Sequence, residues 1–465
     1  MASQSPGMLQ RYRWRELGLF ILPCLIFLLA ITQLFLDKID ARSSLNTHNL
    51  PTIQVLIPVI GLIAAFLTVH IVLSLFFRKA DQVLLPLVGL LSGIGVLMAT
   101  RLGPDLNPPD QALGTRQLVW VLLGLMIFLA TLFLLRNISW LARYKYSAAI
   151  FGLILFCTTL VNTFRVKNLN SPTHDQLNIG PFAFQPSELL KICIVIFFAA
   201  YLSENREVLA EGNLRIGPLR LPPFRQLGPI ALMMLIALLF FVVVREQGLA
   251  LLIYGLFLCM LYLGSGKLTY VLSSLAILIV FGFIAYSLFG YVKQRFAVVG
   301  VDVVNWTPAS EASYTSGAAF QVVQGLIALS SGGILGAGLG LGHPAGAGFV
   351  PVVQSDMVLT GLGEELGLVG LFAIIGIYLL LIYRGYRIAI EATEPFYQLL
   401  AAGLTSIFAL QTLIISAGNL KLFPLTGIPL PFLSYGGSSI LANYIIVGIL
   451  MRISYNTAVE RDGAP

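Results

Sequence analysis

The chain alternates between long apolar runs and short polar breaks along nearly its whole length. A helix of about 20 apolar residues crosses the roughly 30 Å hydrocarbon core of a bilayer, so each such run is a candidate transmembrane helix. The pattern predicts an all-α, polytopic membrane bundle of about twelve transmembrane helices. The predicted spans are Leu17–Leu36, Thr52–Phe77, Val83–Thr100, Gln117–Leu135, Leu141–Thr163, Ser187–Leu202, Gly228–Val244, Gly248–Leu263, Leu268–Gly290, Met357–Tyr383, Phe396–Ala417 and Gly437–Met451.

The composition agrees with this pattern. Of the 465 residues, 57% are hydrophobic and 11% are charged, whereas a soluble globular domain carries about 25% charged residues. This excludes a single water-facing domain, which could not bury so much apolar surface. The first run follows Arg11, Arg13 and Arg15, as in a signal peptide. It is longer than a signal h-region and no small-residue cleavage site follows it, so we expect a retained span.

The positions of the basic residues explain the net charge of +7. Lysine and arginine concentrate in alternate short loops, and loops of this kind face the cytoplasm. The opposite loops are poorer in basic residues and carry Asp37, Asp40, Asp105, Asp110 and Asp175. We expect a multi-pass membrane protein with both termini cytoplasmic, whose basic residues face anionic membrane lipid and not nucleic acid. The basic residues of the predicted inner loops are Arg78, Lys79, Arg136, Arg143, Lys145, Arg206, Arg215, Arg220, Arg225, Lys267, Arg384, Arg387 and Arg452.

A long polar loop between Gly290 and Asp356, rich in glycine, interrupts the apolar pattern and lies outside under this topology. Loops of this length in a compact fold are usually functional or disordered. Apolar patches, such as residues 320–329, favour a partly ordered lid. The predicted organisation is residues 1–80 for the N-terminus and two spans, residues 81–455 for the membrane core including loop 291–356, and residues 456–465 for a cytoplasmic tail.

Asp356 closes this loop and immediately precedes the tenth predicted span. A carboxylate at this place can cap the helix, because free backbone N–H groups and the helix dipole stabilise it. On a helical wheel Thr360, Gly363, Gly367 and Gly370 lie near its face, which leaves a small-residue cleft for a neighbouring helix or a ligand. The residues alone leave a cap and a functional acid as equal alternatives.

Two further groups place charges in or beside predicted spans, where each charge costs about 2.5–3.5 kcal/mol. Glu188 and Lys191 are spaced to pair, either as a self-neutralising ion pair or as the wall of a polar cavity that offers an ammonium to phosphate. Arg245 and Glu246 separate two short spans. They form either an interfacial turn or a helix interruption, where half-helix ends bind ligands.

The neighbouring residues Glu364 and Glu365 lie one turn into the tenth span. Glu364 points roughly to the side of Asp356, and Glu365 points away, where pairing with a cation on a neighbouring helix is the favoured role. The glycine-rich run Gly332–Gly342 lacks the pattern of a phosphate-binding loop and has no strand before it, which favours a flexible or tightly packed outer loop. The four histidines are too scattered to form a metal site.

Four sequence blocks, in this order, resemble the FtsW/RodA/SpoVE (SEDS) family of bacterial cell-wall glycosyltransferases. The likeness extends from about Val83 to Ser454, and the last block is the longest and most specific. The blocks are GPFAFQPSELLK at residues 180–191, QVVQ at 321–324 with the glycine-rich run, Ser355-Asp356 with GEELG at 363–367, and PLTGIPLPFLSYGGSS at 424–439.

The resemblance implies a protein of the bacterial cytoplasmic membrane that polymerises lipid II, the undecaprenyl-pyrophosphate-linked disaccharide-pentapeptide, into glycan strands at the outer face of that membrane and releases undecaprenyl pyrophosphate. It places the family's catalytic aspartate on Asp356 and its cavity Glu and Lys on Glu188 and Lys191. It also implies a ten-helix core, to which the first two spans are an addition, and a class B penicillin-binding protein as transpeptidase partner in cell division or elongation. The other residues expected to bind substrate are Arg245, Glu246, Gln321, Gln324, Ser355, Glu364, Ser434 and Ser438.

The chain departs from the family pattern at three places. Asp175-Gln176 stands where an Arg-Trp pair is usual, and REQG at 245–248 stands where P-D-L-G is usual. Met357-Val358-Leu359 follow the aspartate, at positions where aromatic and aliphatic residues are usual. The cationic side of the predicted site is therefore where this chain differs most from its relatives.

The predicted mechanism uses Asp356 as general base on a sugar hydroxyl of the acceptor. Lys191 and Arg245 are the candidate cations for the leaving pyrophosphate, and a divalent cation, Mg²⁺ or Mn²⁺, is a candidate to share that role. Two other classes remain open. A lipid II flippase or transporter also suits twelve spans and broken helices, and a scaffold would recruit a partner synthase without catalysis.

Overall fold

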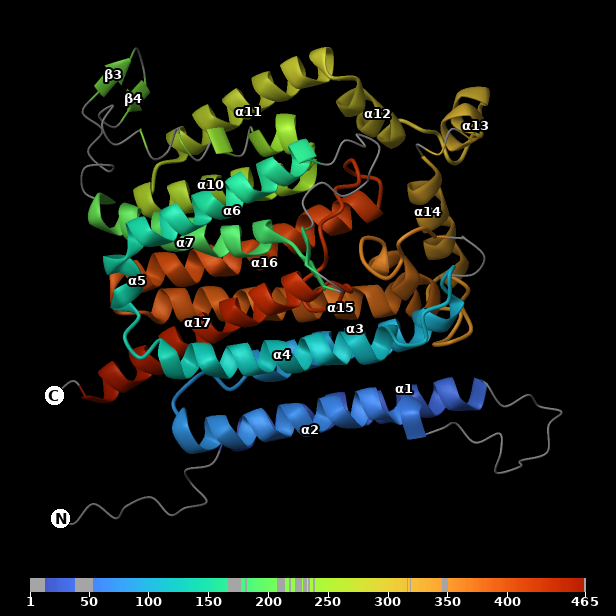
Figure 1. Cartoon of the computed structure of the whole chain (residues 1–465), viewed down its shortest axis with the longest axis horizontal. Helices are drawn as coiled ribbons and strands as arrows, with labels where there is room; N and C mark the ends of the chain where they lie inside the picture. The colour runs from blue at the N-terminus through green and yellow to red at the C-terminus, as the bar shows by residue number, and fades with distance from the viewer. Residues whose placement is uncertain are drawn as a thin grey trace.

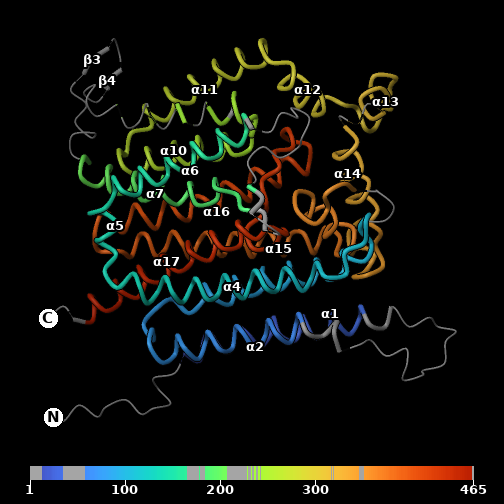
Figure 2. The backbone as a smooth tube through the Cα atoms, in the orientation of Figure 1, coloured from blue at the N-terminus to red at the C-terminus, as the bar shows by residue number. Residues whose placement is uncertain are grey.

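The computed structural model describes residues 13–37, 53–165, 177–179, 182–206, 214–216, 219–221, 228, 232, 235–236, 239–315, 317, 319–344 and 350–463 (Figure 2). Long helices run side by side in one bundle (Figure 1). The predicted all-α membrane fold is confirmed, since eleven helices among the described residues are long and apolar enough to cross a bilayer. They are α1 (Trp14–Asp37), α2 (Ile53–Phe76), α3 (Leu84–Leu102), α4 (Leu113–Leu134), α6 (Lys145–Arg165), α7 (Pro186–Glu204), α10 (Gln247–Ser265), α11 (Leu268–Leu288), α15 (Val358–Glu391), α16 (Pro395–Asn419) and α17 (Gly437–Gly463).

The remaining predicted span, at residues 228–244, lies largely outside the described residues. Its described end is the π-helix η4 (Phe240–Val244), and Arg245 follows it in the left-handed conformation, with φ 62°. The next helix, α10, begins at Gln247. The chain therefore breaks at Arg245 and Glu246, between the two spans that the sequence separated there.

The bundle has a protein-buried centre and lipid-facing flanks. The most apolar part of α7 is 89% buried inside the protein, whereas that of α11 is only 11% buried although its mean hydropathy is higher, 2.3 against 1.6. A helix that is apolar on all sides must be surrounded by protein or lipid, so α7 is a central helix and α11 a peripheral one. In Figure 1, α1 and α2 flank α3 and α4 on one side of the bundle, and α11 lies on the opposite side.

The long segment before α15 is built mainly of short helices, α12 (Gly290–Val299), α13 (Pro308–Thr315) and α14 (Phe320–Gly332). α14 covers the apolar patch from which the sequence predicted a helix, and it packs against α15. The remaining short elements are η3 (Gly103–Asp105), α5 (Ser139–Arg143) and two hairpins, β1 (Leu177–Ile179) with β2 (Phe182–Phe184) and β3 (Leu214–Ile216) with β4 (Leu219–Leu221). β2 leads through Gln185 directly into α7.

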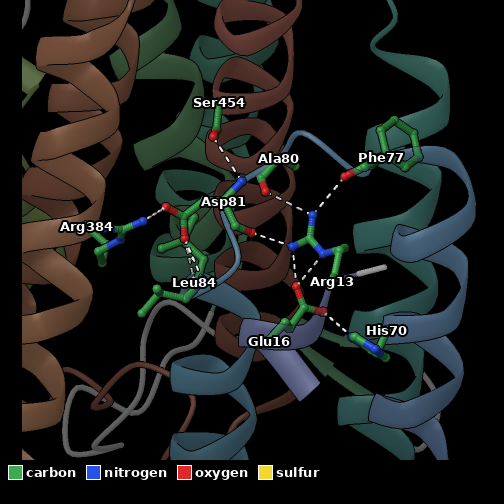
Figure 3. Close-up of polar contacts among 10 residues, drawn as sticks. Arg13, Glu16, His70, Phe77, Ala80, Asp81, Leu84, Arg384 and Ser454 are labelled. Carbon is green, nitrogen blue, oxygen red and sulfur yellow. Dashed lines mark hydrogen bonds and ion pairs between the residues drawn. The ribbon is translucent and has the colours of Figure 1, made fainter. Parts of the chain in front are cut away.

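A buried cluster at the start of α1 attaches the first two helices to the rest of the bundle (Figure 3). Arg13 is 1% exposed and its guanidinium donates hydrogen bonds to the carbonyls of Phe77 (2.8 Å) and Ala80 (2.9 Å), just beyond the end of α2. The same guanidinium pairs with Glu16, whose other oxygen lies 2.8 Å from Nδ1 of His70. Arg13 thus ties the start of α1 to the turn that follows α2.

Asp81 extends this cluster to the core helices. Its carboxylate accepts hydrogen bonds from the N–H groups of Val83 (2.7 Å) and Leu84 (3.0 Å), which caps the start of α3, and it pairs with Arg384 of α15. Its own N–H donates to Oγ of Ser454 in α17, at 3.1 Å. The start of α1 and the C-terminal half of α17 therefore lie at the same end of the bundle, as the predicted topology requires.

Arg13→Ala is expected to destabilise the protein by about 3–5 kcal/mol, because it leaves the buried carboxylate of Glu16 without its cation. The measurement is thermal unfolding of the purified protein in detergent. The control is Arg15→Ala, which also removes one positive charge, two residues further along the chain, but from an exposed side chain. Equal unfolding temperatures for the two variants would contradict the prediction.

Candidate active site

Asp356 lies in the turn that precedes α15 and does not cap that helix. The N-cap residue of α15 is Met357, without a side-chain capping bond. The backbone N–H of Asp356 donates to the carbonyl of Val352 (3.2 Å), and its carbonyl accepts from Nδ2 of Asn419 (3.0 Å). With the backbone held on both sides, the carboxylate faces Gly427, where a Cβ atom would lie 3.6 Å from Oδ2. The capping alternative is thus not the one that the structure adopts.

The turn around Asp356 is fastened to the loop before α17 by a pair of serines. Oγ of Ser434 donates to the carbonyl of Ser355 (2.6 Å) and accepts from the N–H of Leu430 (2.9 Å). The N–H of Tyr435 donates to the carbonyl of Gln354, at 2.8 Å. Residues 354–356 and 430–435 therefore form one unit, although they lie far apart in the sequence.

Three helices of the bundle, α15, α4 and α3, contact this unit. The hydroxyl of Tyr378, in α15, donates to the carbonyl of Pro431 (2.6 Å), and Nε2 of Gln117, in α4, donates to the carbonyl of Ser434 (3.3 Å). In α3, a Cβ on Gly95 would lie 2.7 Å from the carbonyl oxygen of Leu433. Only a glycine allows this loop to pack so closely against α3.

The cation that acts on Asp356 is Arg295 of α12, a residue that sequence reasoning missed. Burial raises the pKa of the Asp356 carboxyl above its ordinary value, while a hydrogen bond from Ser355 and the charge of Arg295 act in the opposite direction. Nη1 of Arg295 donates to the carbonyl of Leu425 at 3.2 Å, two residues from Gly427. The available signal was the rarity of basic residues in the outer loops, which made an arginine there worth attention.

Arg245 contacts Tyr291, which lies in α12 together with Arg295. Its side chain is exposed, and its guanidinium lies 5.3 Å from the centre of the Tyr291 ring. Burial raises the pKa of the Tyr291 phenol, and Arg245 and Arg295 both act to lower it. Both arginines therefore act on Tyr291, and Arg295 also acts on Asp356. Glu246, at the same chain break, is partly buried at the start of α10.

Glu188 and Lys191 occupy the first turn of α7 and are 2% and 0% exposed. Nζ of Lys191 lies 2.8 Å from Oε2 of Glu188, which is the ion pair that their spacing predicted. The N–H of Gln185 donates to Oγ of Ser438 at 3.0 Å, so the start of α7 adjoins the first turn of α17, just after the loop that holds Ser434. The usual Arg-Trp position, Asp175-Gln176, lies outside the described residues.

The two glutamines of α14 support the loop around the site. Nε2 of Gln321 donates to the carbonyl of Pro351 (3.3 Å), at the start of the turn that carries Asp356. Nε2 of Gln324 donates to the hydroxyl of Tyr314 (2.7 Å) and holds α13 against α14. The substrate-binding roles of both residues stay predictions.

The small-residue face next to Asp356 is filled by protein. A Cβ on Gly325 of α14 would lie 2.3 Å from Cε of Met357, and one on Gly332 would lie 2.1 Å from the carbonyl oxygen of Gly363. Of the two occupants that the sequence allowed, a neighbouring helix or a ligand, the structure places the helix α14 there. Glu364, on the same part of α15, accepts a hydrogen bond from the N–H of His343 (2.8 Å).

The comparisons with known proteins agree with this arrangement. The FtsW, RodA and SpoVE family model, described as cell cycle protein, matches residues 82–459. The chain is 34% identical over 400 residues to the peptidoglycan glycosyltransferase RodA of Mycobacterium leprae, covering 84% of this chain and 81% of that protein. It is 35% identical over 399 residues to RodA of Mycobacterium tuberculosis, with 84% and 82% covered. A probable peptidoglycan glycosyltransferase FtsW of Geobacter sulfurreducens is 29% identical over 347 residues, with 73% and 84% covered.

Two solved structures share the fold. A chain from a structure described as structural coordination of polymerization and crosslinking by a peptidoglycan synthase complex aligns at a TM-score of 0.58, with 22% identity over 81% of this chain and 98% of that one. The rod shape determining protein RodA of Thermus thermophilus aligns at a TM-score of 0.51, with 20% identity over 81% and 96%. By sequence match and by fold, this multi-pass bacterial membrane protein belongs to the FtsW/RodA/SpoVE family.

Proposed function

We propose that the protein is a peptidoglycan glycosyltransferase that polymerises lipid II into glycan strands at the outer face of the cytoplasmic membrane. The observation that carries the proposal is the carboxylate of Asp356, which is partly buried, does not cap its helix and is subject to the charge of Arg295. The relatives named peptidoglycan glycosyltransferase support the reaction class. No feature of the described residues favours a flippase or a scaffold over this activity.

Asp356 acts as the general base in the proposed reaction. It accepts the proton of an acceptor sugar hydroxyl, whose oxygen forms the new glycosidic bond with the anomeric carbon of the donor. The bond from that carbon to the phosphate oxygen breaks, its electron pair leaves with undecaprenyl pyrophosphate, and the anomeric configuration inverts. Burial suits this role, because a carboxylate of raised pKa is the stronger base at neutral pH.

Arginine and lysine side chains around the unit bind the pyrophosphate in this proposal. Arg295 and Arg245 flank Tyr291 on α12, and fixed cations stabilise the charge that develops on a leaving group. Lys191 serves from the side of α7, where it is buried with Glu188. The sequence predicted Arg245 and Lys191 for this task, and the structure adds Arg295.

A divalent cation that shares this task stays a prediction. Across the described part of the chain, no group of three His, Cys, Asp or Glu side chains could hold a metal ion. Mg²⁺ is commonly bound by one or two carboxylates together with substrate phosphates. Such an ion would therefore be bound with the pyrophosphate of the substrate and not by the protein alone.

The proposed orientation places the Asp356 end of α15 outside. α15 runs from the turn of Asp356 to Arg384 and Arg387, and Lys79 pairs with Asp462 near the end of α17. Basic loop residues face the cytoplasm, which supports cytoplasmic termini. A class B penicillin-binding protein is the proposed partner, in division or elongation, since a structural neighbour is described as coordinating polymerization with crosslinking.

Asp356→Asn is expected to abolish polymerisation, because the amide keeps the shape of the side chain but cannot accept the proton. Loss of a positioned base lowers a rate about 10²–10⁴-fold. The measurement is the formation of glycan strands from labelled lipid II by the purified protein. Glu311→Gln, an exposed carboxyl on α13, is the control. Unchanged polymerisation in Asp356→Asn, or lipid II translocation without polymerisation, would contradict the proposal.

The rate should fall at acid pH as Asp356 takes up a proton. Because burial raises the pKa of this carboxyl, the midpoint should lie above about 3.9, the value of an unperturbed aspartate. The charge of Arg295 lowers that pKa, so Arg295→Gln should move the midpoint to higher pH. The measurement is the pH dependence of kcat/KM, which reports the free enzyme, with Lys293→Gln, an exposed residue of the same helix, as control. A shift of the midpoint to lower pH in Arg295→Gln would rule out this assignment.

A further inference from the structure

The long helix α15 is broken at Gly367, where φ is 65° and ψ is −171°. In an unbroken helix the carbonyls of Glu364 and Glu365 would accept hydrogen bonds from the N–H groups of Leu368 and Val369. Here these four groups bond instead to the glycine-rich segment, defined as residues 333–342. The two carbonyls accept from the N–H groups of residues 337 (2.9 Å) and 338 (3.0 Å), and the two N–H groups donate to the carbonyls of residues 333 (3.0 Å) and 334 (3.1 Å).

The glycines of this segment are required by how closely it enters the break. A Cβ on Gly336 would lie 2.2 Å from the carbonyl oxygen of Glu365, and Gly336 has a left-handed φ of 86°. A Cβ on Gly367 would lie 2.3 Å from the backbone nitrogen of Gly336. The glycine-rich segment thus packs tightly into the break of α15. This packing accounts for a motif that no nucleotide site explains.

Arg101, in the last turn of α3, fastens this insertion to the core. Its Nη2 donates to the carbonyls of Gly340 (3.0 Å) and Gly342 (2.7 Å), and it also pairs with Asp105. Its Nε lies 3.1 Å from Oε1 of Glu365, which is only 1% exposed and also accepts from the N–H of Gly340 (3.3 Å). The expected pairing of Glu365 with a cation on a neighbouring helix is therefore confirmed.

The break separates the outer part of α15 from the rest of the helix. Residues 358–366 begin two positions after Asp356, and the glycine-rich segment and α14 contact them. The direction of this short piece is therefore set by the inserted segment and not by the membrane-spanning part of α15. A change in the attachment of the segment would move the Asp356 turn relative to Gly427 and Arg295.

We propose that Arg101 is a positioning residue, which fixes the glycine-rich segment and Glu365 to α3 and so holds the Asp356 carboxylate in place. Arg101 acts through these residues and does not contact Asp356 in the structure. The inference rests on the proposed function for its catalytic meaning. The attachment itself is a structural statement that can be tested without activity.

The first arm of the test is hydrogen exchange of the purified full-length protein. Arg101→Gln should speed exchange of the amides of residues 356–369, because the four hydrogen bonds across the break lose their support. Arg387→Gln, which removes an arginine from an exposed ion pair with Glu391, should leave this segment unchanged. Equal exchange in wild type and Arg101→Gln would overturn the proposal whatever the activity.

The second arm is lipid II polymerisation by the same samples, matched for folded protein by size-exclusion chromatography. Arg101→Gln should lower kcat about 10²-fold, the effect of a displacement of about 1 Å at a reacting group, while KM stays within twofold. Its acid midpoint should move to lower pH, because a displaced Asp356 is less buried. Arg101→Lys should recover part of kcat. A wild-type kcat for the folded Arg101→Gln protein, or a lowered kcat with an unchanged midpoint and no recovery by lysine, would overturn the positioning role.

The two arms separate the failure of this inference from that of the proposed function. If the wild type makes no glycan strands, the proposed function fails, and with it the catalytic meaning of Arg101, while exchange still decides the attachment. If the wild type polymerises and Asp356→Asn does not, the function stands. An Arg101→Gln variant with wild-type kcat and pH dependence then refutes the positioning role alone.

Discussion

A polar group in hydrocarbon that has no partner costs several kcal/mol, and this cost shapes every part of the molecule. Among the described residues, the buried carboxylates of Glu16, Glu188 and Glu365 each face a cation from a nearby turn or a neighbouring helix. The pairs of Glu16 with Arg13 and of Glu188 with Lys191 each lie within the start of one helix. The pair of Glu365 with Arg101 joins α15 to α3, and separating these two helices would leave a buried charge without its partner.

The same cost decides where a transmembrane helix can break. The interruption of α15 at Gly367 is possible only because the glycine-rich segment satisfies the four backbone groups that the break exposes. Non-helical backbone at membrane depth persists where protein surrounds it. The break frees the outer end of α15 from the direction of the membrane-spanning part. The carboxylate of Asp356 lies in the turn just before this short outer piece of α15 and is held on its other side by Asn419 and by the loop that contains Ser434.

The residues of the site come from distant parts of the chain. Sequence reasoning placed Asp356 at the outer end of a span and grouped it with the serines of the loop before α17, and the structure shows the contact through Ser434 and Ser355. It could not find Arg295, because nothing in a local pattern says that α12 folds back over the loop at Leu425. It also left a cap and a catalytic role for Asp356 equal, since both predict an acid before a helix. Only the three-dimensional position of the carboxylate, against Gly427, separates them.

The sequence by itself determined the number and order of nearly all the membrane helices, because the thickness of the bilayer sets a length that apolar runs must match. It also determined the pairing of Glu188 with Lys191, which depends only on the spacing along one helix. The tertiary structure alone decided which elements fill the small-residue face beside Asp356 and which cation lies near it. Those contacts join residues that are distant in the chain, and they depend on close packing between helices, which no local pattern encodes. The glycine-rich run shows both sides. Its composition indicated a tight or flexible loop, and only the broken helix of α15 explains why the glycines are needed.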